Sequence, residues 1–294
     1  MKIEHEYNGK KTGVWAEMVC DSIWEHCRIS TMVVRIPRVV LAELNTHRAF
    51  SRNSASSRAI PAKTMRERVE NDPYVPWRWP VNGKGMVPTG YVERPDRRAE
   101  NAQNQWFKGL HQAFYVHKEM ENGPGIHKEV TNRLLEPWMW TEVLITATEW
   151  QNFLLQRAHP AAQDPIRAAA ECVQGLLERH VPTERRFHIP YVRDPDSRPV
   201  VVQMLASARR CRRVSYLRQG VEVAMLEDAR EGLSGLKEDP PHLSPYEHMA
   251  AASDGRRCAN FDGWMSLRWS FERGVVAIEE LESALGAQGD QTCS

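Results

Sequence analysis

Apolar and polar residues alternate over residues 31–36, a pattern that predicts a strand with one buried face. The apolar side of this strand consists of Met32, Val34 and Ile36. A short helix is predicted next, because Pro37 suits a helix start and apolar residues then recur at helical spacing as far as His47. Residues 51–58 are polar and rich in turn formers, so we expect an exposed loop there.

Most of the remaining pattern is helical. Thr64 with Glu67 and Thr148 with Gln151 have capping-box spacing and predict two helix starts, with an apolar run over 143–146 before the second. Asp164 as a cap with Pro165 after it predicts another start. Helices are expected to begin at Thr64 and at Asp164, and others are expected over roughly 100–121, 128–135, 148–157, 220–231 and 275–285, while residues 280–294 are expected to form a frayed tail.

Residues 72–99 hold five prolines and three glycines, which predicts a long irregular excursion. Such a loop is either functional or a flexible surface insert. The chain also contains 10 Trp against 7 Tyr and 7 Phe, an unusual order that by itself identifies no ligand.

Composition narrows the class of protein. The 294 residues suit one large domain or two small ones, and 39 basic against 38 acidic residues give a net charge of +1. A balanced chain has no global field to attract a nucleic acid. No apolar run approaches the roughly 20 residues that span a bilayer, and the first residues do not resemble a signal peptide. The six cysteines form no CxxC pair, so we expect a cytoplasmic protein with reduced thiols and no metal site.

The richest candidate chemistry lies between Thr46 and Arg58. This stretch offers three cations besides hydroxyls, an amide and many backbone N–H groups, which suit a phosphate. On composition alone, a solvated Ser/Arg loop with a core-facing His47 is the simpler interpretation.

The order of these residues resembles the signature of the flavin-dependent thymidylate synthases, Arg-His-Arg-x-x-Ser-x-Asn-x-x-Ser-x-Arg. Six of seven fixed positions match, and Thr46 replaces the first Arg. The matching residues are His47, Arg48, Ser51, Asn53, Ser56 and Arg58. The resemblance implies that Thr46, His47 and Arg48 hold FAD, and that Glu43, Ser56, Ser57 and Arg58 bind the nucleotide.

Two later segments extend the resemblance. Residues 125–137 are similar to the family helix whose Arg reaches the nucleotide, a place that Arg133 takes here. Residues 146–158 are similar to the flavin-contacting segment, so Asn152 corresponds to a flavin contact and Arg157 to the Arg beside the uracil ring. Asn152 alone would equally suit a structural role. Thr146 and Thr148 stand where the family often has Asn and Arg.

A third pair of segments is out of order. Residues 211–216 resemble the family's Ala-Arg-Val-Ser-Phe element, and 241–248 resemble its His-Glu-Thr-Pro-Phe-Glu-His element. Both normally precede the arginine signature, so the resemblance implies a circularly permuted fold. Surface termini that lie close together make such a permutation physically reasonable. By this mapping Ser215, His242 and Ser244 belong to the flavin pocket, although His242 also suits a plain turn. Most of the eight arginines between 185 and 213 are expected to point into solvent.

The resemblance implies one α+β domain over 1–294, with mixed helices and a small antiparallel sheet, and a homotetramer with shared active sites. It implies C5 methylation of dUMP or UMP, with methylenetetrahydrofolate as carbon donor, FAD as hydride carrier and NADPH as reductant. Arg157 is the candidate catalytic residue, because a guanidinium near the uracil ring stabilises negative charge that develops there. An inactive flavin- and nucleotide-binding homologue and a nucleic-acid-binding protein that uses the Ser/Arg loop are the alternatives. We expect no nucleic-acid or membrane partner.

Overall fold

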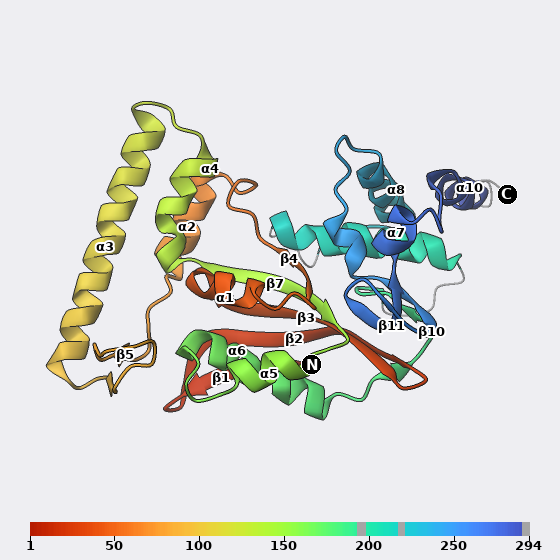
Figure 1. Cartoon of the computed structure of the whole chain (residues 1–294). Coiled ribbons are helices and arrows are strands. Elements are labelled where there is room, and N and C mark those ends of the chain that lie inside the picture. Colours follow the sequence, from red (N-terminus) through yellow and green to blue (C-terminus); the bar gives the residue numbers. More distant parts are fainter. Residues whose placement is uncertain (193–197, 217–220, 290–294) are drawn as a thin grey trace.

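The computed structural model describes residues 1–192, 198–216 and 221–289, and a mainly antiparallel sheet forms its centre (Figure 1). The main path runs β1-β2-β3-β7-β4, and a short β8 pairs parallel with β2. The strands are β1 (Lys2–Tyr7), β2 (Lys10–Trp24), β3 (Cys27–Pro37), β4 (Ser51–Ser54), β7 (Trp140–Ala147) and β8 (Thr183–Glu184). The α+β class expected from the sequence is confirmed.

Strand β3 is the centre of the sheet and is covered on both faces. Its expected apolar side, Met32, Val34 and Ile36, packs into the core beneath α6. Val33 points the other way and is also buried, because it packs into the core formed by α7 and α8. The strand is therefore longer and more deeply buried than the alternation alone predicts.

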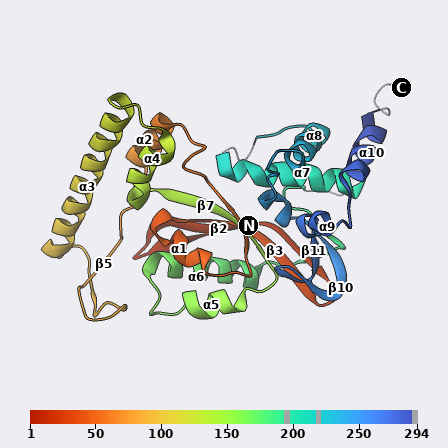
Figure 2. The same cartoon turned by 45° about the horizontal axis from the view of Figure 1, so that its top comes forward.

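Helices cover the two faces unequally, as Figures 1 and 2 show. One face carries α5 (Gln151–Arg157) and α6 (Asp164–Arg179), and the predicted stripe of α6 is buried against the strands. Near the other face lie α7 (Val200–Arg212), η3 (Arg213–Tyr216), α8 (Met225–Leu236), η4 (Ser244–Glu247), α9 (Leu267–Glu272) and α10 (Ile278–Gly289). A second small sheet joins β9 (Phe187–His188), β10 (Ala250–Cys258) and β11 (Phe261–Ser266).

The remaining helices are η1 (Arg38–Val40), α1 (Leu41–Asn45), α2 (Ala62–Asn71), α3 (Arg97–Asn122), α4 (Lys128–Thr131) and η2 (Asn132–Trp138). Among them, α2, α3 and α4 stand at one side of the sheet, whereas α1 lies over it and buries Leu44 in the same core as α5 and α6 (Figure 1). The irregular excursion expected over 72–99 is present as far as residue 96, where α3 follows, and its regular structure consists of the short strands β5 (Trp79–Pro80) and β6 (Tyr91–Val92). Within the described ranges, none of the helices has the length and hydrophobicity to cross a bilayer.

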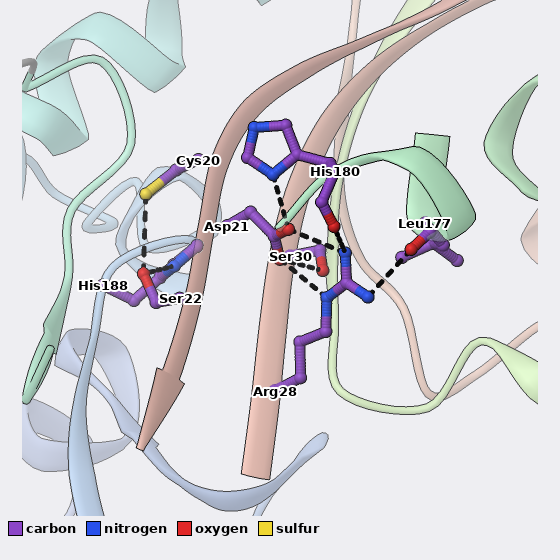
Figure 3. Close-up of polar contacts among 8 residues, drawn as sticks. All are labelled: Cys20, Asp21, Ser22, Arg28, Ser30, Leu177, His180 and His188. Carbon is purple, nitrogen blue, oxygen red and sulfur yellow. Dashed lines mark hydrogen bonds and ion pairs between the residues drawn. The ribbon is translucent and has the colours of Figure 1, made fainter. Parts of the chain in front are cut away.

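A buried carboxylate ties α6 to the sheet (Figure 3). Asp21 on β2 accepts two hydrogen bonds from Arg28 at 2.9 and 2.7 Å, one from Ser30 at 2.8 Å, and one from His180 at 2.8 Å. Arg28 also donates to the carbonyls of Leu177 and His180 at the end of α6. The Asp21 carboxylate is therefore fully hydrogen-bonded within the protein, and this cluster has a structural role in holding β2, β3 and the end of α6 together.

Several local predictions are wrong. Residues 51–58 do not form an exposed loop, because β4 pairs with β7 and buries alternate residues of the segment. Neither capping box operates: α2 begins at Ala62, and Thr148 accepts a hydrogen bond from the backbone of Asp262 instead. Asp164 does not cap α6, since its carboxylate binds Arg78.

The expected frayed tail is helical as far as residue 289. Leu281 and Leu285 of α10 are buried against the core that contains α7 and α8, which explains why this segment is ordered as a helix. Residues 290–294 lie outside the described part of the chain. The helix expected over 220–231 lies instead at 225–236.

The arginines of α7 and η3 do not point into solvent as expected. Asp228, which is buried, pairs with both Arg210 and Arg213. Arg209 pairs with Glu231 and Arg212 with Glu238. These pairs join α7 to α8 and to the turn after it, so this part of the arginine cluster is structural. Arg193 lies outside the described residues.

Candidate active site

Strand β4 divides the arginine signature into two groups. Thr46, His47 and Arg48 precede β4, whereas Ser56 and Arg58 follow it. A strand rises about 3.3 Å per residue, so its four residues place the two groups roughly 10 Å or more apart. The signature therefore presents its side chains at the two ends of one strand rather than in a single loop.

Arg157 is the centre of the first group. Its Nε donates to Nε2 of His47 at 3.0 Å, and its Nη2 donates to Oγ1 of Thr46 at 3.2 Å and to the carbonyl of Glu43 at 3.4 Å. The Thr46 hydroxyl donates in turn to the Glu43 carbonyl at 2.7 Å. Arg157 is the last residue of α5, and its guanidinium lies beside the C-terminal end of α1. The structure thus gathers three other sequence-predicted residues around the Arg157 cation.

His47 is a neutral partner for Arg157. The ring is 5 % exposed and packs edge-on against Phe153, with a centroid separation of 5.0 Å. Burial, together with a smaller effect of the neighbouring cations Arg157 and Arg52, lowers the pKa of His47 to about 4. A neutral ring keeps a lone pair on Nε2, which is what the Arg157 N–H requires.

Other side chains of the first group remain open to a ligand. Oε2 of Glu43 is buried and has no hydrogen-bond partner in the described part of the chain. Arg48 is exposed and forms no ion pair with any described residue. Asn152 is exposed on α5, and its Oδ1 accepts from Gln156 at 2.9 Å, so the two share a face as expected. The buried Glu43 oxygen and the Arg48 guanidinium thus have no partner among the described residues and are available to a ligand.

The second group surrounds a turn over 55–60. The side-chain amide of Asn132, which is buried, donates to the carbonyls of Ser57 at 2.8 Å and Ile60 at 3.1 Å. Ser56 N–H donates to the carbonyl of Ser215 at 3.2 Å. Arg58 is exposed and, within the described ranges, unpaired. The turn therefore presents an available guanidinium on a braced backbone, which suits an anion.

Arg133 and Arg38 approach the same turn through Glu136. This carboxylate accepts from Arg38 at 3.0 Å and from Arg133 at 3.2 Å. Arg38 also donates to the carbonyl of Ala55 at 3.2 Å. Arg133 itself remains exposed, so it faces solvent beside the turn. Asn132 and Glu136 were missed by sequence reasoning, because an amide and a carboxylate that brace a turn have no motif of their own.

The late segments lie against β4 and the second group. Ser215 on η3 contacts the turn through the Ser56 bond already described, and η4 packs beside β4. His242 and Ser244 are half-buried, and their side chains bond to each other at 3.2 Å. Burial lowers the pKa of His242, and the nearby Arg212 adds to this effect. Segments more than 150 residues apart in sequence therefore meet at one strand.

A chain of buried hydroxyls and imidazoles links these segments to the sheet. His188 bonds to Ser22 through Nδ1 at 2.9 Å, as Figure 3 shows, and to Thr31 through Nε2 at 2.7 Å. Thr31 bonds to Thr146 at 2.6 Å, and Thr146 bonds to Nδ1 of His248 at 2.9 Å. Burial lowers the pKa of both histidines to about 3. Thr146, which departs from the family residue, thus has a structural function here.

The thiols and metal-ligating groups add no further site. The described cysteines are free, and burial raises the pKa of Cys172 to about 12, which disfavours the nucleophilic thiolate. The part of the chain that the structure describes contains no group of three His, Cys, Asp or Glu residues placed to hold a metal ion.

Comparison with known proteins gives a family match over most of the chain. The family model Thy1, described as thymidylate synthase complementing protein, matches residues 4–183. No curated protein matches the chain. Among solved structures, the chain is similar to a UMP/dUMP methylase PolB from Streptomyces cacaoi bound with 5-Br UMP, with 17 % identity and a TM-score of 0.46. That similarity covers 56 % of this chain and 89 % of the other.

Proposed function

Because the chain belongs to the family of thymidylate synthase complementing proteins, the flavin-dependent thymidylate synthases that its sequence resembles, we propose that it methylates C5 of a uracil nucleotide. The substrate is dUMP or UMP, the carbon donor is methylenetetrahydrofolate, and NADPH is the reductant. FAD, when bound, carries the reducing equivalents. The arrangement of three acceptors around Arg157 is the observation that carries this proposal.

The residues present fit an anionic flavin and an anionic nucleotide. Arg48 and Arg58 are exposed cations without an ion-pair partner among the described residues, and Glu43 has an orphaned buried oxygen. We assign Thr46, His47, Arg48, Asn152, Ser215, His242 and Ser244 to the flavin, and Glu43, Ser56, Ser57, Arg58, Arg133 and Arg157 to the nucleotide. His47 acts mainly through Arg157, since its Nε2 is already engaged.

Arg157 is the proposed catalytic residue. When C5 of the ring becomes nucleophilic, negative charge develops on the ring oxygens. A fixed guanidinium beside them stabilises the transition state, which carries this charge, more than it stabilises the ground state. His47, Thr46 and the Glu43 carbonyl hold the guanidinium before substrate arrives, so little reorganisation is needed. No step of this kind requires a cysteine nucleophile.

Thr46, which replaces the first Arg of the signature, contributes hydrogen bonds to Arg157 and to the Glu43 carbonyl in place of a charge. The family Arg at this position would add a second guanidinium beside Arg157, whereas the Thr46 hydroxyl accepts from Arg157 and donates to Glu43. We infer that Thr46 removes one positive charge from the site but fixes the position of the Arg157 guanidinium through these hydrogen bonds.

We infer a homotetramer with active sites shared between subunits, as the family resemblance implies. One chain places Arg157 and Arg58 near opposite ends of β4, and these residues are assigned to the ring and to the phosphate of one nucleotide. Whether the two arginines of one site belong to the same chain is decided by mixing inactive variants. We also infer a circular permutation of a single domain over 1–294, because the late segments at 211–216 and 241–248 return to β4.

Parallel turnover with dUMP and UMP, measured as tritium release from C5, tests the proposed reaction. We expect purified protein to show flavin absorption and to release tritium from at least one of the two nucleotides when folate and NADPH are present. Flavin binding without release would identify an inactive homologue. Colourless protein that FAD does not reconstitute would overturn the proposal, and steeply salt-dependent DNA or RNA binding would then favour the nucleic-acid alternative.

A further inference from the structure

The irregular excursion over 72–99 encloses a pocket of about 720 Å³ that the proposed reaction does not use. The pocket lies between this excursion, α3 and the first turn of α6. Its wall contains none of the residues assigned to the flavin or the nucleotide. Its volume is typical of small-molecule sites, which span roughly 300–1,000 Å³.

Aromatic side chains from separate elements line this pocket, which we call the aromatic pocket. The lining rings are Tyr74, Trp79, Tyr91 and Trp106. Trp106 on α3 meets Trp79 at a centroid separation of 6.0 Å and Tyr74 at 6.3 Å, both in edge-on geometry. Two of the ten tryptophans of the chain thus line one cavity, so part of the unusually high tryptophan content is found at this pocket.

The rings are held in place before any ligand arrives. The indole N–H of Trp106 donates to the carbonyl of Tyr74 at 2.9 Å, and the ring packs on Trp138 at 5.4 Å. Tyr74 also meets Trp140 of the central sheet at 5.4 Å. A rigid aromatic wall loses little conformational entropy when a flat molecule stacks on it.

The charges in the wall cancel each other. Arg78 and Asp164 are the charged residues that line the pocket, and they form a two-pronged ion pair at 2.6 and 2.5 Å. The Arg78 guanidinium also lies over the ring of Tyr91, 3.6 Å from its centroid. Since the lining cation already has a carboxylate, the pocket offers no free charge to a phosphate.

The exposed part of the lining combines a large apolar side chain with two amides. Met86, which belongs to the lining, is fully exposed to solvent. A bound ring would remove apolar surface of Met86 and the indoles from water, which favours binding. The edges of such a ring would find polar partners in Asn82 and Gln163.

We propose that the aromatic pocket binds the planar, uncharged heteroaromatic ring of a small molecule. Stacking on indole and phenol rings tolerates different ring systems, because every such ring has a π face. Purine, pterin and pyridine rings share this chemistry, and the wall does not distinguish among them. The inference is independent of the proposed methylation reaction.

Calorimetric titration of the full chain tests the inference. The probes are adenosine, 6-methylpterin and nicotinamide, each added to protein already saturated with FAD so that flavin sites do not respond. We expect at least one probe to bind with a Kd below the millimolar range, and the three arms identify the preferred ring. We expect adenosine to bind at least as tightly as AMP, because the pocket has no free cation.

Two variants locate the binding. Trp79→Ala is expected to raise Kd about tenfold or more, since base–indole stacking is lost. Met86→Glu changes a fully exposed side chain, so folding is preserved, and a charge at the mouth is expected to raise Kd as well. Trp269→Ala, which removes an indole that lines a different pocket, is the control and is expected to leave Kd unchanged.

The inference is overturned if no probe binds at millimolar concentration, if AMP binds much more tightly than adenosine, or if both pocket variants bind like the unaltered protein. Because none of these readouts involves tritium release, their outcome is separable from that of the methylation experiment.

Discussion

Single residues decide how the proposed chemistry is prepared. Arg157 has a guanidinium whose three protein acceptors lie within 3.4 Å, and one of them, His47, accepts as a neutral ring, a state that burial and two neighbouring cations favour by lowering its pKa. The sequence predicted that Arg157 and His47 both matter, but it did not predict that they contact each other. A hydrogen bond between residues 110 positions apart depends on the fold rather than on any local pattern.

Replacing Arg157 tests this arrangement. Arg157→Ala is expected to keep flavin absorption and to lower tritium release by about 100-fold or more, the usual effect of removing a charge-stabilising donor. Arg167→Ala on α6, whose guanidinium pairs with Glu171, is the matched control and is expected to turn over normally. Normal turnover by the Arg157 variant would refute its catalytic role.

At the scale of elements, β4 differs most from the sequence-based expectation. Residues 51–58 are polar enough to suggest a loop, yet the backbone of 51–54 pairs with β7 and the buried side chains of Ser51 and Asn53 lie in the sheet. Ser51 finds a partner in Asn260 at 3.3 Å, which comes from a segment 209 residues later, whereas Nδ2 of Asn53 has no hydrogen-bond partner among the described residues. Alternation rules cannot anticipate partners supplied by so distant a segment.

The brace between η2 and the turn over 55–60 is a second test. Asn132→Ala removes the amide that bonds to Ser57 and Ile60, so we expect a loss of about 1–3 kcal/mol in the free energy of unfolding and a higher KM for the nucleotide. Asn104→Ala on the exposed side of α3 is the control. An unchanged KM would show that the turn does not position the substrate phosphate.

The imidazole chain across the sheet predicts a pH dependence. His188 and His248 take up protons near pH 6.5 when unfolded, but their folded pKa values are lowered to about 3 by burial. The unfolded state therefore binds more protons between these values, and the free energy of unfolding decreases as pH falls from about 6.5 to 4.

Urea unfolding at pH 7 and pH 4.5 measures this loss. A double variant with His188→Gln and His248→Gln keeps hydrogen-bonding side chains but does not titrate, so we expect a smaller decrease between the two pH values. His111→Gln, an exposed histidine of α3, is expected to behave like the unaltered protein. An equal decrease in all three proteins would contradict the assigned cause.

At the scale of the whole molecule, the signature matches at six of seven positions along the chain and is divided in space by β4. The residues before β4 are assigned to the flavin and those after it to the nucleotide, and in a symmetric oligomer one site can draw on two chains. The net charge of +1 does not describe the candidate site. Many arginines form ion pairs within the fold, whereas Arg48 and Arg58 have no ion-pair partner among the described residues and leave positive charge at the site.

Mixing two inactive variants tests the sharing of sites. Arg58→Ala and Arg157→Ala are each expected to lose tritium release. If the two residues of one site come from different chains, co-refolded mixtures regain activity in about a quarter of the sites by random assortment. If both residues come from the same chain, every site remains defective and mixing restores nothing.

The sequence by itself determined the family, the α+β class, most helices to within a few residues and the identity of the candidate site residues, because spacing and residue type are local properties of the chain. Only the tertiary structure decided that 51–54 is a strand, that the arginines of α7 and η3 are ion-paired, that His47 holds Arg157, and that the 72–99 excursion encloses an aromatic pocket. Each of these depends on a partner from a distant segment, and the free energy of a buried polar group is set by that partner rather than by its neighbours in sequence.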